Sequence, residues 1–389
     1  MDELFEYMQL QLDAINTNFV RYANDVIDWN SRMLGLLGPR GVGKTTLFLQ
    51  RALREQRGQK VLYVSADHSY FSRNGLYDVA EEFYKMGGEI LYIDEVHNFE
   101  GWSRELKMIY DGLPNLKVRF TGSSALNILG GEADLSRRAP IFKMQGLSFR
   151  EFLCLKTGEN FKSYSLNEIL NNEAKLPNIE HPLALFNEYK RLGYYPFFRE
   201  PCFGLLIEQI VTSTIQFDIP QVANLNVSSG RKLKKLLVSI ADAVPFKPNV
   251  TKLASKINVS RITLEEYLAH LQDAQMIYGL RNKTNRFGNF AKVEKLYLDN
   301  TVLLNVLSEG KPNDGTVRET LFLNQMRVNN EVFATDVGDF QVGNAIFEVG
   351  GKNKTGKQIK SVGNSYVVRD DIEFGFGKTI PLWAFAMNY

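Results

Sequence analysis

Five short apolar runs recur along the first part of the chain and predict the strands of a buried sheet. The first run is followed by glycine, and amphipathic helical patterns such as residues 102–110 separate several of the runs. Strands that alternate with helices are typical of a parallel sheet covered on both faces. The pattern therefore predicts an α/β fold for a first domain over residues 1–150, with residues 1–30 helical. The predicted strands are residues 33–37, 60–64, 89–94, 117–121 and 140–144.

The rest of the chain shows three different patterns. Residues 151–228 read as mostly helical and are predicted to form a separate part. Within residues 229–305, the apolar spacing predicts a long helix, a short helix over 251–257 and a third helix capped by Ser260. Two strands around a polar tip follow, and three helices with a hairpin are the outline of a winged helix. Residues 306–389 begin with a helix and continue with short strands and many glycines.

The composition narrows the class of protein. The chain has 389 residues, which is enough for about two or three domains. Apolar residues make up 44% of it, which excludes global disorder, and no apolar stretch approaches the roughly 18 residues of a membrane span. An acidic start without a secretory pattern, and only two cysteines, predict a protein of the reducing cytoplasm. The net charge of +2 limits any nucleic-acid surface to a local patch.

Residues 38–45 match the phosphate-binding pattern G-x-x-x-x-G-K-[ST] in full, between the first predicted strand and a predicted helix. Glycines let backbone amides wrap around phosphate oxygens, and the helix that follows presents its positive end to the same anion. Lys44 is expected to reach the β- and γ-phosphates, and the Thr45 hydroxyl is expected to bind Mg²⁺. The predicted nucleotide-binding residues are Gly38, Pro39, Arg40, Gly41, Val42, Gly43, Lys44, Thr45 and Thr46.

A pair of carboxylates ends the third predicted strand. Asp94 is expected to hold Mg²⁺, usually through water, and Glu95 is expected to orient or deprotonate the water that attacks the γ-phosphate. A strand that ends in a solvated acidic turn is the alternative for this pair taken alone. The phosphate loop that precedes it in the chain favours the catalytic interpretation.

Three further positions belong to the predicted site or lie close to it. The fourth strand ends in Ser123 and Ser124, and either one is expected to hold the attacking water beside the γ-phosphate; a simple polar turn is the alternative. Arg138, which follows Arg137, is a candidate arginine finger that acts on a neighbouring subunit, or else a solvated basic residue. His97 comes soon after the carboxylate pair; a surface or packing role is favoured for it, and a position near the nucleotide is the alternative.

These motifs resemble one family, the prokaryotic AAA-type (archaeal-ATPase-like) P-loop ATPases. Residues 102–107 and 147–152 are the specific part of the resemblance, because many families share the phosphate loop. The resemblance covers nearly the whole chain and implies ATP binding and hydrolysis. It also implies an ATPase core, a helical lid, a winged helix and a C-terminal domain similar to restriction endonucleases, in that order. The matching segments are residues 38–45, 93–95, 102–107, 121–124 and 147–152.

Basic residues concentrate in the predicted winged helix. Asp242 is the only acidic residue between residues 231 and 261, so this segment is a candidate for DNA contact. The predicted reading helix, however, carries Glu265, Glu266 and Asp273, and acidic side chains repel phosphates. An interaction or packing module is therefore the alternative to DNA binding. The basic residues are Arg231, Lys232, Lys234, Lys235, Lys247, Lys252, Lys256 and Arg261.

Three carboxylates in the last part follow the helix-strand-strand order of PD-(D/E)xK nucleases. Glu319 lies on a predicted helix, Asp339 on a strand and Glu348 at the end of the next strand. Such nucleases gather carboxylates around a metal ion and use a nearby lysine to stabilise charge. Here the position of that lysine is Gly350, and Lys352 comes two residues later. We therefore predict a degenerate endonuclease-like domain that cleaves no DNA.

The favoured function is an ATPase whose Mg²⁺-dependent hydrolysis drives a conformational switch of the lid and winged helix. An ATP-gated DNA-binding protein or nuclease is the alternative. A P-loop kinase is disfavoured, because Glu95 directly after Asp94 suits the activation of water, which a kinase must exclude. ATP is the predicted partner, DNA and further copies of the chain are additional candidates, and no membrane is expected.

Overall fold

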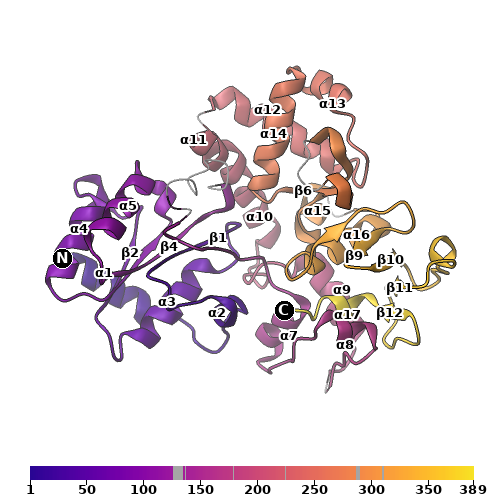
Figure 1. Ribbon diagram of the computed structural model, residues 1–389, viewed down its shortest axis with the longest axis horizontal. Helices are drawn as coiled ribbons and strands as arrows, with labels where there is room; N and C mark the ends of the chain where they lie inside the picture. Colours follow the sequence, from indigo (N-terminus) through magenta and orange to yellow (C-terminus); the bar gives the residue numbers. More distant parts are fainter. Residues whose placement is uncertain (126–134, 136, 178, 224, 286–289, 309–310) are drawn as a thin grey trace. The chain divides into compact units, whose positions relative to one another are not determined.

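The computed structural model describes residues 1–125, 135, 137–177, 179–223, 225–285, 290–308 and 311–389. These residues fold into two compact units, Met1–Gln145 and Gly146–Tyr389 (Figure 1). The boundary expected near residue 150 lies inside helix α7 (Phe149–Thr157), and the chain divides a few residues earlier. The three parts expected after residue 150 all belong to the second unit.

The first unit is built on five parallel strands in the order β2-β3-β4-β1-β5. All five predicted strands are confirmed, with small shifts at their ends. Every residue of β1, β2 and β3 is buried, as their unbroken apolar runs require, whereas the short edge strand β5 is partly exposed. The strands are β1 Met33–Gly38, β2 Val61–Ser65, β3 Ile90–Asp94, β4 Lys117–Ser123 and β5 Ile141–Lys143.

Helices cover both faces of this sheet (Figure 1). The chain crosses from β1 to the edge strand β2 and then returns through β3 to β4. Because such connections are right-handed, the outward and return crossings place α3 on one face and α4 and α5 on the other. The predicted helices after the phosphate loop and over residues 102–110 are confirmed. The helices are α1 Asp2–Asp13, α2 Ala23–Val26, α3 Lys44–Glu55, α4 Leu76–Lys85 and α5 Trp102–Gly112.

The first 30 residues are not continuously helical, contrary to the prediction, because the chain leaves helical conformation between α1 and α2. There the Asn16 side chain accepts a hydrogen bond from the backbone N–H of Asn18 at 2.8 Å, and such local bonds compete with helical ones. Gln50 of α3 donates to the carbonyls of Asn16 and Phe19 at 2.7 and 2.9 Å. The segment is therefore held by the helix that follows the phosphate loop.

Helices make up most of the first half of the second unit. The helices predicted in the basic segment are confirmed, and the Ser260 hydroxyl accepts the backbone N–H of Thr263 at 3.1 Å as the predicted N-cap. A π-helical turn, Thr214–Asp218, joins α10 to α11. These helices are α7 Phe149–Thr157, α8 Leu166–Leu170, α9 Pro182–Leu192, α10 Phe203–Ser213, α11 Ile219–Ala223, α12 Val227–Ala241, α13 Val250–Ile257 and α14 Arg261–Asp273.

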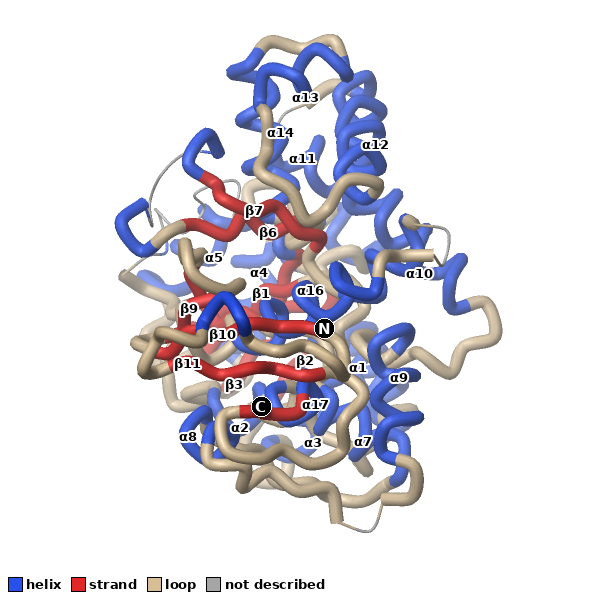
Figure 2. The backbone as a smooth tube through the Cα atoms, turned by 90° about the vertical axis from the view of Figure 1, so that its right-hand side faces the viewer, coloured by secondary structure: helices blue, strands red, loops and turns tan. Residues whose placement is uncertain are grey.

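Two sheets complete the second unit (Figure 2). The predicted hairpin is confirmed as the antiparallel pair β6 and β7. A five-stranded sheet has the order β12-β11-β10-β9-β8, with β10, β11 and β12 parallel and the rest antiparallel. Phe322 of α16 contacts the rings of Phe347 and Phe385 at centroid distances of 5.2 and 5.0 Å, which builds the core against this sheet.

The remaining elements have the following bounds: β6 Ile277–Arg281, β7 Val293–Leu298, α15 Thr301–Leu307, α16 Asp314–Met326, β8 Val332–Phe333, β9 Phe340–Val342, β10 Ala345–Gly350, β11 Ser365–Arg369, β12 Thr379–Pro381 and α17 Leu382–Phe385.

Candidate active site

The nine predicted nucleotide-binding residues lie together on the loop between β1 and α3 and on the first turn of that helix. Gly43 has a φ of 96°, in the left-handed region that favours glycine, and α3 starts directly after it. A Cβ at Gly38 would lie 2.4 Å from the carbonyl oxygen of Met144, so only glycine fits between β1 and the segment after β5. Backbone geometry and packing thus explain two of the glycines of the motif.

The Lys44 side chain is buried in this loop. Its Nζ donates hydrogen bonds to the carbonyl oxygens of Gly38 and Pro39 at 2.9 and 3.0 Å. The ammonium group therefore lies within the curve of the loop. A bound phosphate chain offers charged oxygens that can replace these neutral carbonyl partners.

Three hydroxyl groups surround the buried carboxylate of Asp94. Thr45 Oγ1 lies 2.6 Å from Asp94 Oδ2, the Tyr63 hydroxyl lies 2.9 Å from the same oxygen, and Thr121 donates to Oδ1. Burial and the nearby Asp94 charge raise the pKa of Tyr63 far above its ordinary value, so its phenol group stays a neutral donor. The structure thus brings the two predicted metal-binding residues, Thr45 and Asp94, into direct contact.

The oxygens around Asp94 suit a magnesium ion that also binds phosphate. Within the described part of the chain, no lysine or arginine forms an ion pair with Asp94. Nor do the described residues include a group of three or more His, Cys, Asp and Glu side chains that could hold a metal ion. Mg²⁺ prefers a few protein oxygens together with water and phosphate oxygens. The hydroxyl of Thr45 and the carboxylate of Asp94 fit that preference.

Glu95 has a constrained backbone and a side chain that reaches solvent. Its φ and ψ of 50° and 44° are unusual for a residue other than glycine, and its N–H donates to Thr121 Oγ1 at 2.9 Å. The Glu95 side chain is 25% exposed, and its Oε2 lies 3.3 Å from Nε2 of His97. The backbone of Glu95 is thus fixed directly after Asp94, while its carboxylate stays accessible to water.

The tip of β4 lies directly beside the start of the phosphate loop, because Ser123 pairs with Gly38 in the parallel register of β4 and β1. Ser123 and Ser124 are both buried, at 3% and 1% exposure. The Ser123 hydroxyl accepts the backbone N–H of Ala125 at 3.3 Å. The register supports the predicted proximity to the γ-phosphate, and the choice between the two serines stays open.

Arg138 lies in an ion pair within its own unit. Its Nε and Nη2 each donate to the Asp111 carboxylate at 3.0 Å, and this hydrogen bonding lowers the pKa of Asp111. The pairing ties the segment before β5 to α5. A finger that acts on a neighbouring subunit would have to leave Asp111, and that role stays a prediction.

Four residues of the site were not assigned to it from the sequence. Tyr63 and Thr121 bond Asp94; Tyr63 belongs to no short motif, and Thr121 begins the 121–124 segment but was given no role. Buried Arg21 donates to the carbonyl oxygens of Val42 and Gln145, the latter at 2.7 Å. His97 was expected at the surface or in packing, and the structure places it in the core beside Glu95. The only sequence signal that places His97 in the site is its spacing from the carboxylate pair.

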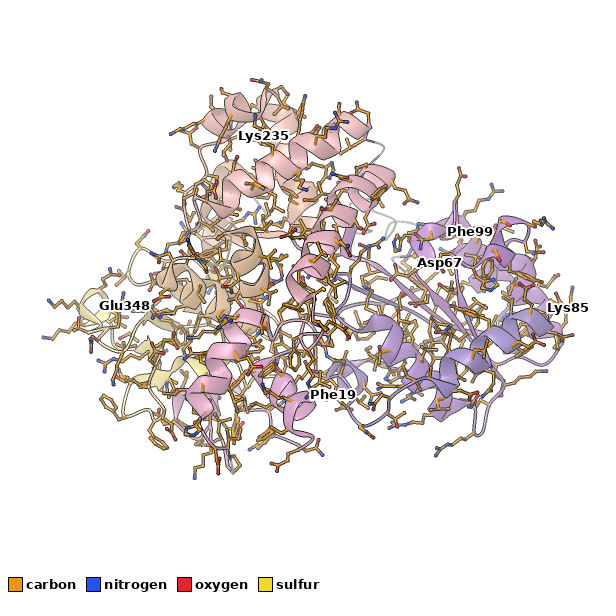
Figure 3. All side chains as sticks on the ribbon, turned by 180° about the vertical axis from the view of Figure 1, so that it is seen from behind. Phe19, Asp67, Lys85, Phe99, Lys235 and Glu348 are labelled. Atoms are coloured by element: carbon orange, nitrogen blue, oxygen red, sulfur yellow. The ribbon has the colours of Figure 1, made fainter. Side chains whose placement is uncertain are left out.

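The three carboxylates of the predicted endonuclease-like part are paired with lysines. Lys295 Nζ lies 3.2 Å from Glu319 and 3.5 Å from Asp339. Lys354 Nζ lies 3.1 Å from Oε1 of Glu348, which is marked in Figure 3. Two ammonium groups thus lie against the three carboxylates and compensate part of their charge.

The lysine that reaches Glu348 is Lys354 and not Lys352. Strand β10 ends at Gly350, and Lys352 lies in the turn that follows. A Cβ at Gly350 would lie 2.6 Å from the Lys354 side chain, so Lys354 crosses the space that the glycine leaves open.

The basic residues of the segment 231–261 lie mainly on two helices, α12 and α13. Lys235 lies on α12 (Figure 3), and Lys252 and Lys256 are exposed on α13. On α14, Arg261 pairs with Glu265 at 3.1 Å. The side chain of Arg261 is therefore occupied within its own helix, whereas the lysines of α12 and α13 face solvent.

Comparison with known proteins supports the assignment of the first unit. Residues 30–153 match the family model of an AAA domain, and this range contains every predicted site residue. Together with the parallel sheet, the match supports an AAA-type P-loop ATPase core. Residues 197–314 match a domain of unknown function, DUF8612. That match names no activity for the second unit.

Two solved structures are similar over much of the chain. A Walker-type ATPase of Pyrococcus abyssi is 14% identical, with 72% of this chain and 91% of that chain covered at a TM-score of 0.42. DnaA from Aquifex aeolicus, bound to AMPPCP, is 14% identical, with 69% and 87% covered at a TM-score of 0.26. Likeness at this level says nothing about function. Curated proteins yield no match. No helix in the described ranges is long and apolar enough to cross a membrane.

Proposed function

We propose that the first unit binds ATP together with Mg²⁺ and hydrolyses the ATP. One observation carries the proposal: Thr45 Oγ1 lies 2.6 Å from Asp94 Oδ2, beside the loop that holds Lys44. A hydroxyl and a carboxylate of these two motifs hold magnesium next to a phosphate chain in P-loop enzymes. The carboxylate of Glu95, the next residue, is open to water.

Each residue has a distinct part in the proposed reaction. The backbone N–H groups of the loop and the Lys44 ammonium bind and orient the phosphates. Glu95 accepts a proton from the water that attacks the γ-phosphorus. Bound Mg²⁺ supplies neutralisation of the phosphate charge. Ser123 or Ser124 orients the water at the end of β4.

The test is phosphate release by the intact chain in the presence of ATP and Mg²⁺. Glu95→Gln keeps the size of the side chain but removes the base, so turnover should fall by about 10²-fold or more while ATP stays bound. A phosphate-release assay measures the rate, and calorimetry measures the affinity. Glu81→Gln is the matched control, because Glu81 pairs with Lys85 on the surface of α4. Turnover of Glu95→Gln at the parental rate would mean that Glu95 is not the base.

We also propose that hydrolysis drives a conformational switch of the lid and the winged helix. Arg21 supports this idea, because it bonds both Val42 in the phosphate loop and Gln145, the last residue of the first unit. A movement of the loop on phosphate binding would therefore be transmitted to the end of that unit. Amide hydrogen exchange over residues 146–152 should differ between the complexes with an ATP analogue and with ADP. Identical exchange in the two complexes would contradict the switch.

A DNA-binding role is the second candidate, and the exposed lysines of α12 and α13 favour it. The affinity for duplex DNA should then fall steeply with salt, since bound counterions are released. Lys252→Ala together with Lys256→Ala should reduce the logarithmic salt slope by about 0.9 for each phosphate that these lysines neutralise. Lys85→Ala on α4 is the control. An affinity for DNA that changes neither with salt nor with these substitutions would indicate a protein-interaction module. A homo-oligomer and a cytoplasmic location stay predictions.

A further inference from the structure

His97 lies between the C-terminal ends of β3 and β4, the two strands that carry the predicted catalytic groups. It lies in the 3₁₀ turn η2 (Val96–Asn98) that follows β3, and it is only 4% exposed. Its Nε2 lies 3.3 Å from Oε2 of Glu95, and its Nδ1 accepts the backbone N–H of Ser123 at 3.5 Å. The imidazole ring therefore lies between the carboxylate after β3 and the tip of β4, hydrogen-bonded to the second and 3.3 Å from the first.

The contact with Ser123 decides the protonation state of the ring. Because Nδ1 accepts the N–H of Ser123, a neutral imidazole carries its proton on Nε2, which faces Oε2 of Glu95 at 3.3 Å but outside hydrogen-bond geometry. The bond from Ser123 is itself longer than a strong hydrogen bond. In proteins without bound substrate, contacts of catalytic groups are often long and tighten when the substrate binds.

The remaining freedom of Glu95 lies in its side chain. Its backbone is held by the bond from its N–H to Thr121 and by the left-handed conformation. Whether its carboxylate turns toward His97 or toward the attacking water therefore depends on how firmly the imidazole holds it. A shift of Ser123 at the tip of β4 would change that hold, because Ser123 is the other partner of His97.

We propose that His97 is a positioning residue that couples Glu95 to the tip of β4, so that the arrival of the γ-phosphate at Ser123 and Ser124 controls when Glu95 activates water. This inference rests on the proposed ATP hydrolysis and adds a control step to it. His97 touches neither the phosphate nor the water, and it acts through Glu95. Packing of a buried histidine is the competing explanation, and the experiments below separate the two.

The first experiment is a double-mutant cycle on turnover. His97→Ala should lower kcat by roughly 10-fold or more at nearly unchanged KM, because a misplaced base slows the chemical step without weakening ATP binding. His97→Gln retains one donor and one acceptor and should restore part of the rate. In the Glu95→Gln background, His97→Ala should add little, since both changes affect one unit. His68→Ala is the control, because His68 caps the separate turn after β2.

Three outcomes would overturn the inference. The first is a His97→Ala variant with the parental kcat. The second is a full additional loss of rate in the double variant, which would mean that His97 acts independently of Glu95. The third is an equal loss of rate and of thermal stability in His97→Ala and His97→Gln, which would mean that His97 only packs.

The second experiment needs no turnover and so separates this inference from the proposed function. The chain has four histidines, so ¹⁵N-histidine labelling gives few ring signals, and His97→Ala identifies those of His97. We expect the Nε2-protonated tautomer and a shift of its signals in Glu95→Gln and on binding of a non-hydrolysable ATP analogue with Mg²⁺. The inference is overturned if the His97 signals shift neither in Glu95→Gln nor on binding of the analogue. A chain that shows these shifts but releases no phosphate overturns the proposed hydrolysis alone.

Discussion

The two groups of carboxylates expected near metal ions have opposite surroundings. In the first unit, buried Asp94 accepts hydrogen bonds from three hydroxyl groups, none of which carries a charge. In the second unit, Glu348 is equally buried, at 3% exposure, but the ammonium group of Lys354 lies 3.1 Å away, and the other two carboxylates share Lys295. A carboxylate paired with an ammonium group is already neutralised, whereas one surrounded by hydroxyl groups still favours a cation. The neighbours of a carboxylate, more than its place in a motif, distinguish the proposed metal site from a structural ion pair.

The largest effect is expected from a substitution in the phosphate loop of the first unit. Lys44→Ala removes the ammonium group that the phosphate loop holds, and a hydrogen bond to a charged group contributes about 1.5–3 kcal/mol. ATP affinity should therefore fall by about 10- to 100-fold, as measured by calorimetric titration of the intact chain with Mg²⁺. Lys85→Ala, at an exposed lysine on α4, should leave the affinity unchanged. Parental affinity in a folded Lys44→Ala protein would refute the nucleotide site.

A smaller effect is expected from a substitution that removes the ammonium group beside Glu348 in the second unit. Lys354→Met leaves the buried Glu348 carboxylate without its partner, which should lower the free energy of unfolding by about 1–3 kcal/mol, since the lysine itself is partly exposed. Denaturant unfolding of the full chain measures the change. Lys352→Met, at an exposed lysine in the turn after β10, serves as the control. Equal stability of the two variants would mean that the ion pair does not hold Glu348.

No change at all is expected when the second region is tested as a nuclease. Linear and supercoiled DNA should stay intact with Mg²⁺ or Mn²⁺, with or without ATP, because Lys295 and Lys354 already pair with the carboxylates that a metal ion would need. Gel electrophoresis after prolonged incubation measures this. Metal-dependent cutting that disappears in both Asp339→Ala and Glu348→Ala would make the chain an ATP-coupled nuclease and would remove the contrast between the two regions.

Local patterns predicted those parts of the fold that depend on neighbours in the sequence. Strands β1, β2 and β3 appear as apolar runs because a buried parallel strand must be apolar on both faces. Ser260 was predictable as an N-cap because its bond to the N–H of Thr263 spans only three residues. Residues 1–30 were wrongly predicted as continuously helical, because the bonds that hold the segment after α1 come from Gln50 on another helix.

The sequence alone determined the phosphate loop, the Asp94 and Glu95 pair and the chemistry expected of them, since each of these lies in one short run with a required spacing. Tertiary structure alone decided what surrounds them. The insertion of β4 between β1 and β3 brings Ser123 to Gly38 and Thr121 to Asp94, and this strand order leaves no trace in the local pattern. The same holds for Lys354, which reaches Glu348 only because the chain turns after Gly350. Contacts between distant residues depend on how the strands are ordered and where the chain turns. Neither can be inferred from the spacing of apolar residues or from a motif.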